Sequence, residues 1–185
     1  YMDYPCEYID KEGNVVLRTK YGSGDFQEGL APMQREGEEL SGFMDKAGNI
    51  VIEPQFYSVE GFKDGMARVM IEPREIDTDK LLNPRDEKLP QIRYSIEKWG
   101  YINKEGNVVI EPKFEYASDF SEGLALVGKW SENGFMYQTG YINAYGEYVI
   151  EPKYLQIDGL NGDFRNGVAL VPYEKRDSLD TEFSF

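Results

Sequence analysis

The sequence contains no histidine, a single cysteine and no long apolar run. Without histidine, the Ser-His-Asp and Cys-His arrangements of nucleophilic enzymes and most zinc sites are excluded. The lone Cys6 cannot form an internal disulfide, and we interpret it as a half-buried small apolar residue rather than a reactive thiol. No segment approaches the run of about 18 apolar residues that a membrane-spanning helix needs. We therefore expect no membrane insertion.

Basic residues are also scarce. The chain of 185 residues has 20 Lys and Arg against 34 Asp and Glu, which gives a net charge of −14. Proteins that bind nucleic acid carry the opposite balance, because they must replace counterions on phosphates. We expect no nucleic-acid partner, and a cationic partner or simple solubility fits the charge better.

No motif of a cofactor-dependent enzyme is present. The glycines match neither a phosphate-binding loop nor a dinucleotide fingerprint, so we expect no cofactor. Carboxylates are so abundant that a chance pair at glycosidase spacing carries no information. The acidic residues Asp77, Asp79, Asp86 and Glu87 form either a weak calcium site or a solvated patch, but they lack the spacing of a calcium loop. We predict no catalytic residues and no metal site, and thus a protein that is not an enzyme.

What the sequence does contain is one repeat of about 35 to 40 residues, present four times. Its best-preserved first half runs from Gly100 to Phe114, and the matching second half runs from Phe120 to Val127. The first copy is the weakest, with Glu7 in place of glycine and Thr19 in place of proline, as expected of a terminal copy. We predict a single repeat domain over residues 1–185, with repeats at about 6–36, 41–70, 99–129 and 139–173, an insertion at 71–98 and a tail at 174–185.

The first half of the repeat predicts a hairpin. An alternating segment such as Tyr101-Ile102-Asn103 opens a strand, and its last position, Asp or Asn in every copy, suits a type I turn. The glycine three residues later can adopt positive φ and close the hairpin. The return strand, rich in Val and Ile, should end at Glu-Pro because proline donates no hydrogen bond to the ladder. These turn glycines are Gly13, Gly48, Gly106 and Gly146.

The second half predicts another turn, such as Glu122-Gly123, and a third strand. A phenylalanine precedes this turn in all four copies. We interpret it as a core residue, because one such ring buries about 150–250 Å². The constant phenylalanines are Phe26, Phe62, Phe120 and Phe164. The turn glycines of this half are Gly29, Gly65, Gly123 and Gly167.

These two halves resemble the bacterial WG repeat, also called the KWG repeat, in its G-[YF]-I-[DN]-K-x-G-[NE]-x-V-I-x-P-x-[FY] and F-x-[ED]-G-L-A-x-V signatures. The resemblance covers most of the chain apart from the ends and the insertion. The Trp-Gly pair that names the family is intact only as Trp99-Gly100, whereas Ser41 and Thr139 occupy the tryptophan position in two other copies. The resemblance implies a β-rich binding scaffold from a bacterium, with no catalytic residues to carry over. A cell-surface or secreted location is slightly favoured over the cytoplasm.

A repeat of three short strands cannot bury its faces alone, so adjacent copies must stack. We predict an all-β fold in which four repeats of about three strands each stack as an open β-hairpin solenoid. The alternative is a closed ring like a small β-propeller. A propeller blade usually has four strands, and the unequal intervals between copies also favour the open form.

Aromatic residues outside the repeat positions are the candidate binding residues, because a large rigid ring with a polar group suits a contact surface. They are Tyr94, Trp99, Trp130, Phe135 and Tyr137. Some lie near an Asn133-Gly134 turn, which predicts a hairpin, or in the insertion, which is either a solvated loop or a recognition loop.

Two binding functions are consistent with these features. We predict a non-catalytic scaffold for protein or peptide partners, with the oligomeric state left open. The alternative is a carbohydrate or cell-envelope binding module that uses exposed aromatic rings and carboxylates.

Overall fold

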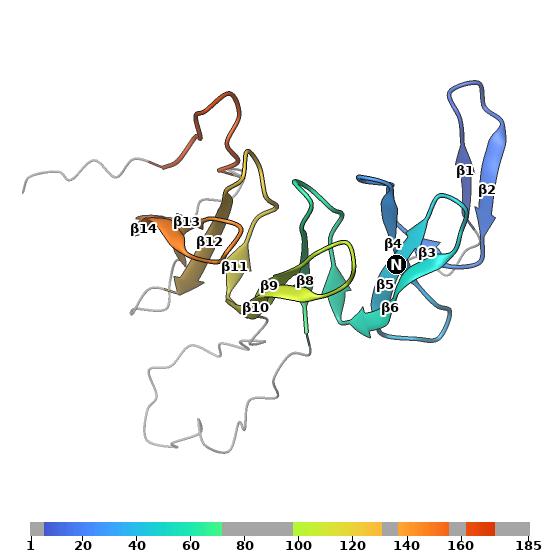
Figure 1. Ribbon diagram of the computed structural model, residues 1–185, viewed down its shortest axis with the longest axis horizontal. Coiled ribbons are helices and arrows are strands. Elements are labelled where there is room, and N and C mark those ends of the chain that lie inside the picture. The colour runs from blue at the N-terminus through green and yellow to red at the C-terminus, as the bar shows by residue number, and fades with distance from the viewer. Residues whose placement is uncertain (1–5, 72–97, 131–136, 156–161, 173–185) are drawn as a thin grey trace, which may run out of the picture.

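The computed structural model describes residues 6–71, 98–130, 137–155 and 162–172. These residues form β-strands and no helix (Figure 1), which confirms the predicted all-β class. The strands are β1 (Cys6–Ile9), β2 (Val15–Thr19), β3 (Gly22–Ser23), β4 (Leu30–Gln34), β5 (Ser41–Asp45), β6 (Ile50–Phe56), β7 (Ser58–Val59), β8 (Ala67–Met70), β9 (Trp99–Ile102), β10 (Val108–Phe114), β11 (Tyr116–Ala117), β12 (Ala125–Trp130), β13 (Tyr137–Ile142) and β14 (Tyr148–Leu155).

Several sequence-based predictions fall outside these ranges. Most of the insertion at 71–98, the tail at 174–185 and the Asn133-Gly134 turn are not described. The same holds for the acidic residues Asp77, Asp79, Asp86 and Glu87.

The hairpin turn of each repeat forms as the sequence predicts. In the second copy, the Asp45 carboxylate accepts hydrogen bonds from the backbone N–H groups of Ala47 and Asn49, each at 2.9 Å. The Asn49 side chain also donates to this carboxylate, and these hydrogen bonds lower the pKa of Asp45. Gly48 completes the turn with a φ of 81°, a conformation that costs glycine little.

The prediction that Glu-Pro ends the return strand is wrong. Strand β10 continues two residues past Pro112 to Phe114. The ladder skips at this point, because Ile110 pairs with Tyr101 and Phe114 pairs with Trp99. The extra residues form a bulge, and β10 lies at the edge of its sheet. Proline is tolerated at both an edge and a bulge, because its missing donor is not needed there.

A glycine is needed opposite this bulge for a steric reason. A Cβ atom built on Gly100 would lie 2.4 Å from the carbonyl oxygen of Ile110 and 2.7 Å from the nitrogen of Pro112. Gly42 and Gly140 face the same obstruction in their own copies. The bulge and the glycine are therefore a matched pair, and both are missing from the first copy, which has Glu7 and Thr19.

Each four-stranded sheet combines strands from two adjacent repeats. The strand orders are β3-β4-β5-β6, β7-β8-β9-β10 and β11-β12-β13-β14, all with antiparallel pairing. The first two strands belong to the second half of one repeat, and the last two are the hairpin of the next. The two-residue strands β3, β7 and β11 add a fourth strand to the three that the sequence indicated. The first hairpin, β1–β2, forms a two-stranded sheet.

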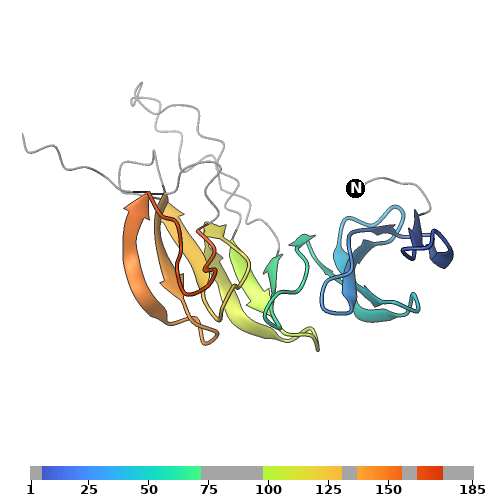
Figure 2. The ribbon, with the colours of Figure 1, turned by 90° about the horizontal axis from the view of Figure 1, so that it is seen from above.

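The hydrophobic core lies between consecutive sheets, which follow one another in chain order (Figures 1 and 2). One buried cluster, which includes Phe43, Ile52 and Val69, joins the β3–β6 sheet to the β7–β10 sheet. The equivalent cluster around Ile110 and Val127 joins the β7–β10 sheet to the β11–β14 sheet. Adjacent repeats thus share their core, and the sheets form an open row that is not closed into a barrel.

Each constant phenylalanine packs on an aromatic residue in the first strand of its own repeat's hairpin. The ring centroids of Phe120 and Tyr101 lie 4.8 Å apart in an edge-on arrangement. Phe62 and Phe120 are buried, which confirms the core interpretation for the two inner copies. Phe26 and Phe164, in the outer copies, are only half-buried.

Tyrosine hydroxyl groups also link the two halves of a repeat, because they donate hydrogen bonds to backbone carbonyl oxygens. The Tyr101 hydroxyl donates to the carbonyl oxygen of Ser118 at 2.8 Å, and Tyr141 donates to that of Gly162 at 2.7 Å. Burial raises the pKa of Tyr141 to about 12. Both side chains therefore remain neutral donors at physiological pH.

Candidate functional site

The outer strand of each hairpin carries an exposed valine at the same repeat position, and β2 and β10 carry a second one just before it, Val15 and Val108. Val16, Val51, Val109 and Val149 lie on β2, β6, β10 and β14, and their exposed fractions are 61%, 47%, 43% and 57%. We call these four residues the valine row. Scattered exposed apolar residues need no explanation. A valine that is exposed at the same position of all four copies is instead a repeated feature of the surface.

The strand alternation explains why these valines point outward. The next residue along β2, β6 and β10 points inward and packs on the turn glycine of the following repeat. Ile52 Cγ2 would lie 3.1 Å from a Cβ atom on Gly106, and Ile110 Cγ2 would lie 3.2 Å from one on Gly146. Because neighbours in a strand face opposite sides, the inward isoleucine forces the valine before it outward.

Carboxylates accompany three of the four valines. Glu53, Glu111 and Glu151 follow at a spacing of two, on the same face of their strands, and all three are exposed. Glu53 forms an ion pair with Arg35 at 2.6 Å. In the first copy Arg18 takes this place and pairs with Glu7 at 2.7 Å.

β6, β10 and β14 are edge strands. An edge strand leaves one row of backbone donors and acceptors unpaired, and an extended chain can add to it. The Glu-Pro bulge interrupts this edge, so the usable ladder is limited to the residues before the proline. Each edge therefore offers a short backbone ladder, an exposed valine and a carboxylate.

A second repeated feature is structural. The residue before each second-half turn glycine has a positive φ of 50° to 54°. The side chains of Glu28, Asp64 and Glu122 accept hydrogen bonds from the corresponding turn of the following repeat. Asp64 accepts from the Gly123 N–H at 2.9 Å, and Glu122 accepts from the Asn166 and Gly167 N–H groups at 2.6 and 2.8 Å. We call this series the carboxylate ladder.

Glu28 is the first rung of the carboxylate ladder. It accepts from the Gly65 N–H at 3.1 Å and forms an ion pair with Lys104 at 2.9 Å. The Lys104 hydrogen bond is the largest cause of a lowered Glu28 pKa, and the Gly65 N–H adds to it. The positive charge of Lys104 and the backbone dipoles hold this carboxyl group ionised.

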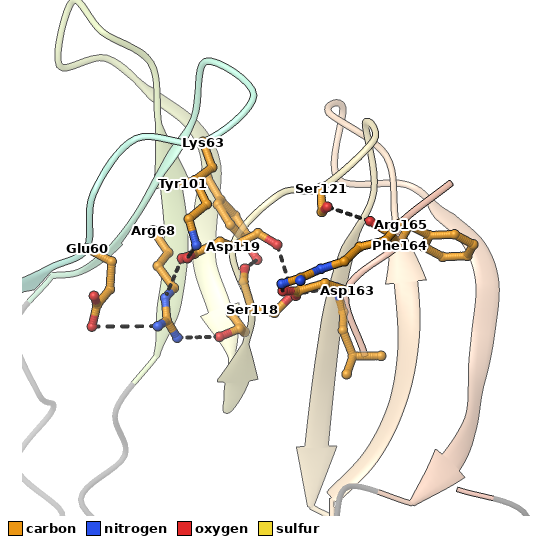
Figure 3. Close-up of polar contacts among 12 residues, drawn as sticks. Glu60, Lys63, Arg68, Tyr101, Ser118, Asp119, Ser121, Asp163, Phe164 and Arg165 are labelled. Carbon is orange, nitrogen blue, oxygen red and sulfur yellow. Dashed lines mark hydrogen bonds and ion pairs between the residues drawn. The ribbon is translucent and has the colours of Figure 1, made fainter. Parts of the chain in front are cut away.

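The interface between the second and third copies contains a cluster of charged side chains (Figure 3). Arg68 donates to the carbonyl oxygen of Ala117 at 2.6 Å, and its Nε lies 3.0 Å from Asp119 Oδ1. These two atoms form an ion pair rather than an aligned hydrogen bond. Lys63 donates to the other Asp119 oxygen at 2.6 Å. Asp119 is thus neutralised by two cations from the preceding repeat.

Of the five predicted binding residues, only Trp99 has a described side chain. Trp99 is half-buried against the core, and the guanidinium of Arg68 lies 5.2 Å from its ring centroid. Trp130 and Tyr137 are register partners on β12 and β13. Tyr94 and Phe135 lie outside the described residues. The structure therefore brings two of the five together through the backbone and places Trp99 on a different sheet.

Sequence reasoning missed Arg68 and the valine row. Arg68 had a visible signal, because it is the one charged residue at a third-strand position where the other copies have Pro32, Leu126 and Leu170. The valine row also had one, since period-2 alternation gives adjacent apolar residues opposite faces.

Neither a metal centre nor a membrane helix emerges from the part of the chain that the structure describes. No group of three His, Cys, Asp or Glu residues there could hold a metal ion. No helix there is long and apolar enough to cross a membrane.

A comparison with known protein families shows which family this chain belongs to. The model of the WG containing repeat matches four segments, residues 8–38, 42–72, 99–129 and 140–171. The chain belongs to the WG repeat family. In this WG repeat protein, the glycine of the Trp-Gly pair is the one that fits beneath the bulge. The family and the repeated β-structure suggest a repeat-containing binding module. No curated protein and no solved structure gave a match.

Proposed function

We propose that this WG repeat protein is a non-catalytic scaffold that binds an extended segment of a protein or peptide along its outer strands. The valine row on edge strands carries the proposal. A partner that adds to an edge strand gains backbone hydrogen bonds, and its alternate side chains provide specificity. Repetition of the same edge on several sheets would allow several weak contacts to act together.

The chemistry of the edges favours a particular kind of segment. An exposed valine followed at a spacing of two by Glu53, Glu111 or Glu151 suits a strand that alternates aliphatic with basic side chains. The net charge of −14 favours the same partner over an acidic one. Charge of this kind contributes mainly to selectivity and association rate, and apolar burial contributes to affinity.

The resolved pKa shifts of carboxyl groups among the described residues support a non-catalytic role. Asp10, Asp45 and Glu28 all have lowered pKa values, and hydrogen bonds within turns or the carboxylate ladder are the causes. A general acid would need the opposite shift. Glycan binding has less support, because Trp99 has its ring against Arg68 rather than presented as a stacking platform.

A displayed library of random peptides tests the proposal. We expect the whole chain to enrich peptides that alternate aliphatic residues with Lys or Arg. Their affinities would be measured by fluorescence anisotropy on the wild type and on a variant with Val51→Thr, Val109→Thr and Val149→Thr. Each change replaces a methyl group, worth about 0.8 kcal/mol when buried, with a hydroxyl group, so the triple variant should bind at least about tenfold more weakly.

A matched control carries Ile9→Thr, Leu40→Thr and Val168→Thr, three exposed aliphatic residues outside the valine row. It should bind the selected peptides like the wild type. Equal binding by the two triple variants would contradict the proposal. Failure to enrich any peptide, together with hits on a glycan array, would favour the carbohydrate function instead.

A further inference from the structure

The fourth copy has an asparagine at the repeat position where the carboxylate ladder has an acidic residue. This position is Glu28, Asp64 and Glu122 in the first three copies and Asn166 in the fourth. Asn166 has the same backbone conformation as the other three, with a φ of 54°. Unlike a carboxylate, the amide group of an asparagine can react with its own backbone.

Asn166 is followed by Gly167, and this pairing favours spontaneous deamidation. A glycine has no side chain to obstruct the approach of its own nitrogen to the asparagine side chain. The Gly167 nitrogen loses its proton and bonds to Asn166 Cγ, the Cγ–Nδ2 bond breaks, and ammonia leaves. A water molecule then opens the resulting five-membered ring at one of its two carbonyl groups, which gives aspartate or isoaspartate.

Glu122 of the third copy binds both backbone nitrogens of this pair. Its carboxylate accepts hydrogen bonds from the Asn166 N–H at 2.6 Å and from the Gly167 N–H at 2.8 Å. The Gly167 nitrogen must give up its proton before it can attack, and the hydrogen bond to Glu122 retains that proton. The carboxylate also disfavours a second negative charge beside it. The attacking form of the nitrogen is therefore suppressed while this contact is closed.

The turn around the pair restricts the reaction further. Arg165 and Val168 exchange backbone hydrogen bonds across the turn at 2.8 and 3.3 Å. Ser121 of the third copy donates to the carbonyl oxygen of Phe164 at 2.7 Å (Figure 3). Ring formation changes the backbone between residues 166 and 167, so these hydrogen bonds oppose it. The reaction requires the contact between the third and fourth copies to open locally.

We propose that Asn166 is a site of spontaneous deamidation whose rate is controlled by Glu122, so that the reaction takes place when the contact between the third and fourth copies opens. Water can reach this position in any copy. Glu28, Asp64 and Glu122 are each followed by another repeat, and all three are exposed, as Asn166 is. The proposal goes beyond the proposed function, because it depends on neither the valine row nor a partner.

The two products have different effects on the contact. Aspartate at position 166 would restore the acidic residue of the other copies and leave the backbone of the turn unchanged. Isoaspartate adds a carbon atom to the main chain before Gly167, which would displace the Gly167 N–H from Glu122. Isoaspartate formation would therefore loosen the contact between the third and fourth copies irreversibly.

Ageing of the whole chain at neutral pH, followed by peptide mapping, tests the proposal. Trypsin cleaves after Arg165, so the peptide from Asn166 to Lys175 separates this asparagine from Asn161, which also precedes a glycine. Mass spectrometry follows deamidation over time, and a sample taken at the start corrects for reaction during digestion. Asn166 in the folded chain should react at least about threefold more slowly than in a synthetic peptide of residues 163–171, because hydrogen bonds to a charged group must break first.

Substitutions at Glu122 provide the decisive comparison. Glu122→Ala should accelerate deamidation at Asn166 by about three- to tenfold, because it removes both hydrogen bonds and the charge. Glu122→Gln should accelerate it less, since the amide oxygen still accepts a hydrogen bond. Glu28→Ala, the same change in the first copy, is the matched control and should leave the Asn166 rate at the wild-type value. Circular dichroism would verify that each variant is folded.

Three results would overturn the inference. In the first, Asn166 in the wild-type chain reacts as fast as in the synthetic peptide. In the second, a folded Glu122→Ala variant reacts no faster than the wild type or the Glu28→Ala control. In the third, Asn166 reacts in none of the variants. Because these experiments use no ligand, their failure would leave the proposed binding function untouched.

Discussion

The first hairpin and the third-copy hairpin have the same motif and different surroundings. In the third copy, Ile102 is buried between a neighbouring strand and an adjacent sheet, whereas Ile9 of the first copy is exposed. Local turn geometry is the same in both, since Gly13 and Gly106 have φ values of 87° and 81°. The comparison teaches that the motif itself determines the hairpin, while burial comes from the neighbours.

The largest effect is expected from the constant phenylalanine. Phe120→Ala should reduce the free energy of unfolding by about 3–5 kcal/mol, because it removes a fully buried ring. Phe26→Ala, at the half-buried equivalent in the first copy, should cost about half as much or less. Urea denaturation of both variants measures the difference. Equal losses would show that burial in the repeat interfaces does not determine stability.

The glycine beneath the bulge gives the next largest effect. Gly100→Ala should destabilise the protein by about 2–3 kcal/mol, because the new Cβ atom meets backbone atoms that cannot move independently. The control is Glu7→Ala in the first copy, where the ladder is regular around residue 7 and no Glu-Pro bulge lies opposite. It removes only an exposed ion pair with Arg18, which solvent screens, so it should cost far less than Gly100→Ala. Thermal unfolding of the two variants compares them, and a neutral Gly100→Ala would refute the steric account.

The smallest effect concerns Glu28, whose pKa is lowered chiefly by Lys104. A carboxyl group with a lowered folded-state pKa stabilises the protein above its unfolded value of 4.5. That stabilisation is lost as the pH falls through the folded-state pKa. The gap in unfolding free energy between the wild type and Glu28→Gln should therefore narrow on acidification from neutral pH to about pH 3.

Lys104→Ala provides the companion measurement. It should raise the pKa of Glu28 and move the acid loss of stability to higher pH, while the Gly65 hydrogen bond remains. A gap between wild type and Glu28→Gln that does not change with pH would contradict the assigned cause. Glu28 is about one third exposed, so solvent screening keeps the effect small.

Much of the fold could be predicted from the sequence, because its signals are local. Asp45 and Gly48 specify a turn through their own hydrogen bonds and dihedral angles, and the Val- and Ile-rich runs specify strands. The proline was misread, because proline usually interrupts a ladder. Its tolerance here depends on an edge position and on a glycine in another strand, and neither is visible from residues 111–112 alone.

The candidate site was harder to predict, because it depends on which face is covered. Val51 and Ile52 are both apolar, and only the turn of the next repeat determines which of them is buried. The surplus of aromatic residues in the sequence pointed instead to Trp99, but the guanidinium group of Arg68 lies over the Trp99 ring. The residues Tyr94 and Phe135 stay predictions, as do the side-chain roles of Trp130 and Tyr137.

The sequence repeat and the four-stranded sheet are offset by half a repeat, so the unit that recurs in the sequence is not the unit that forms one sheet. A fragment cut at a sequence boundary, between Gln34 and Ser41, would split the β3–β6 sheet through its middle. A cut at Tyr57 falls between sheets and would leave each fragment with intact ladders. Trimming, grafting or fusion of such modules should therefore use the boundaries of the sheets rather than those of the sequence repeat.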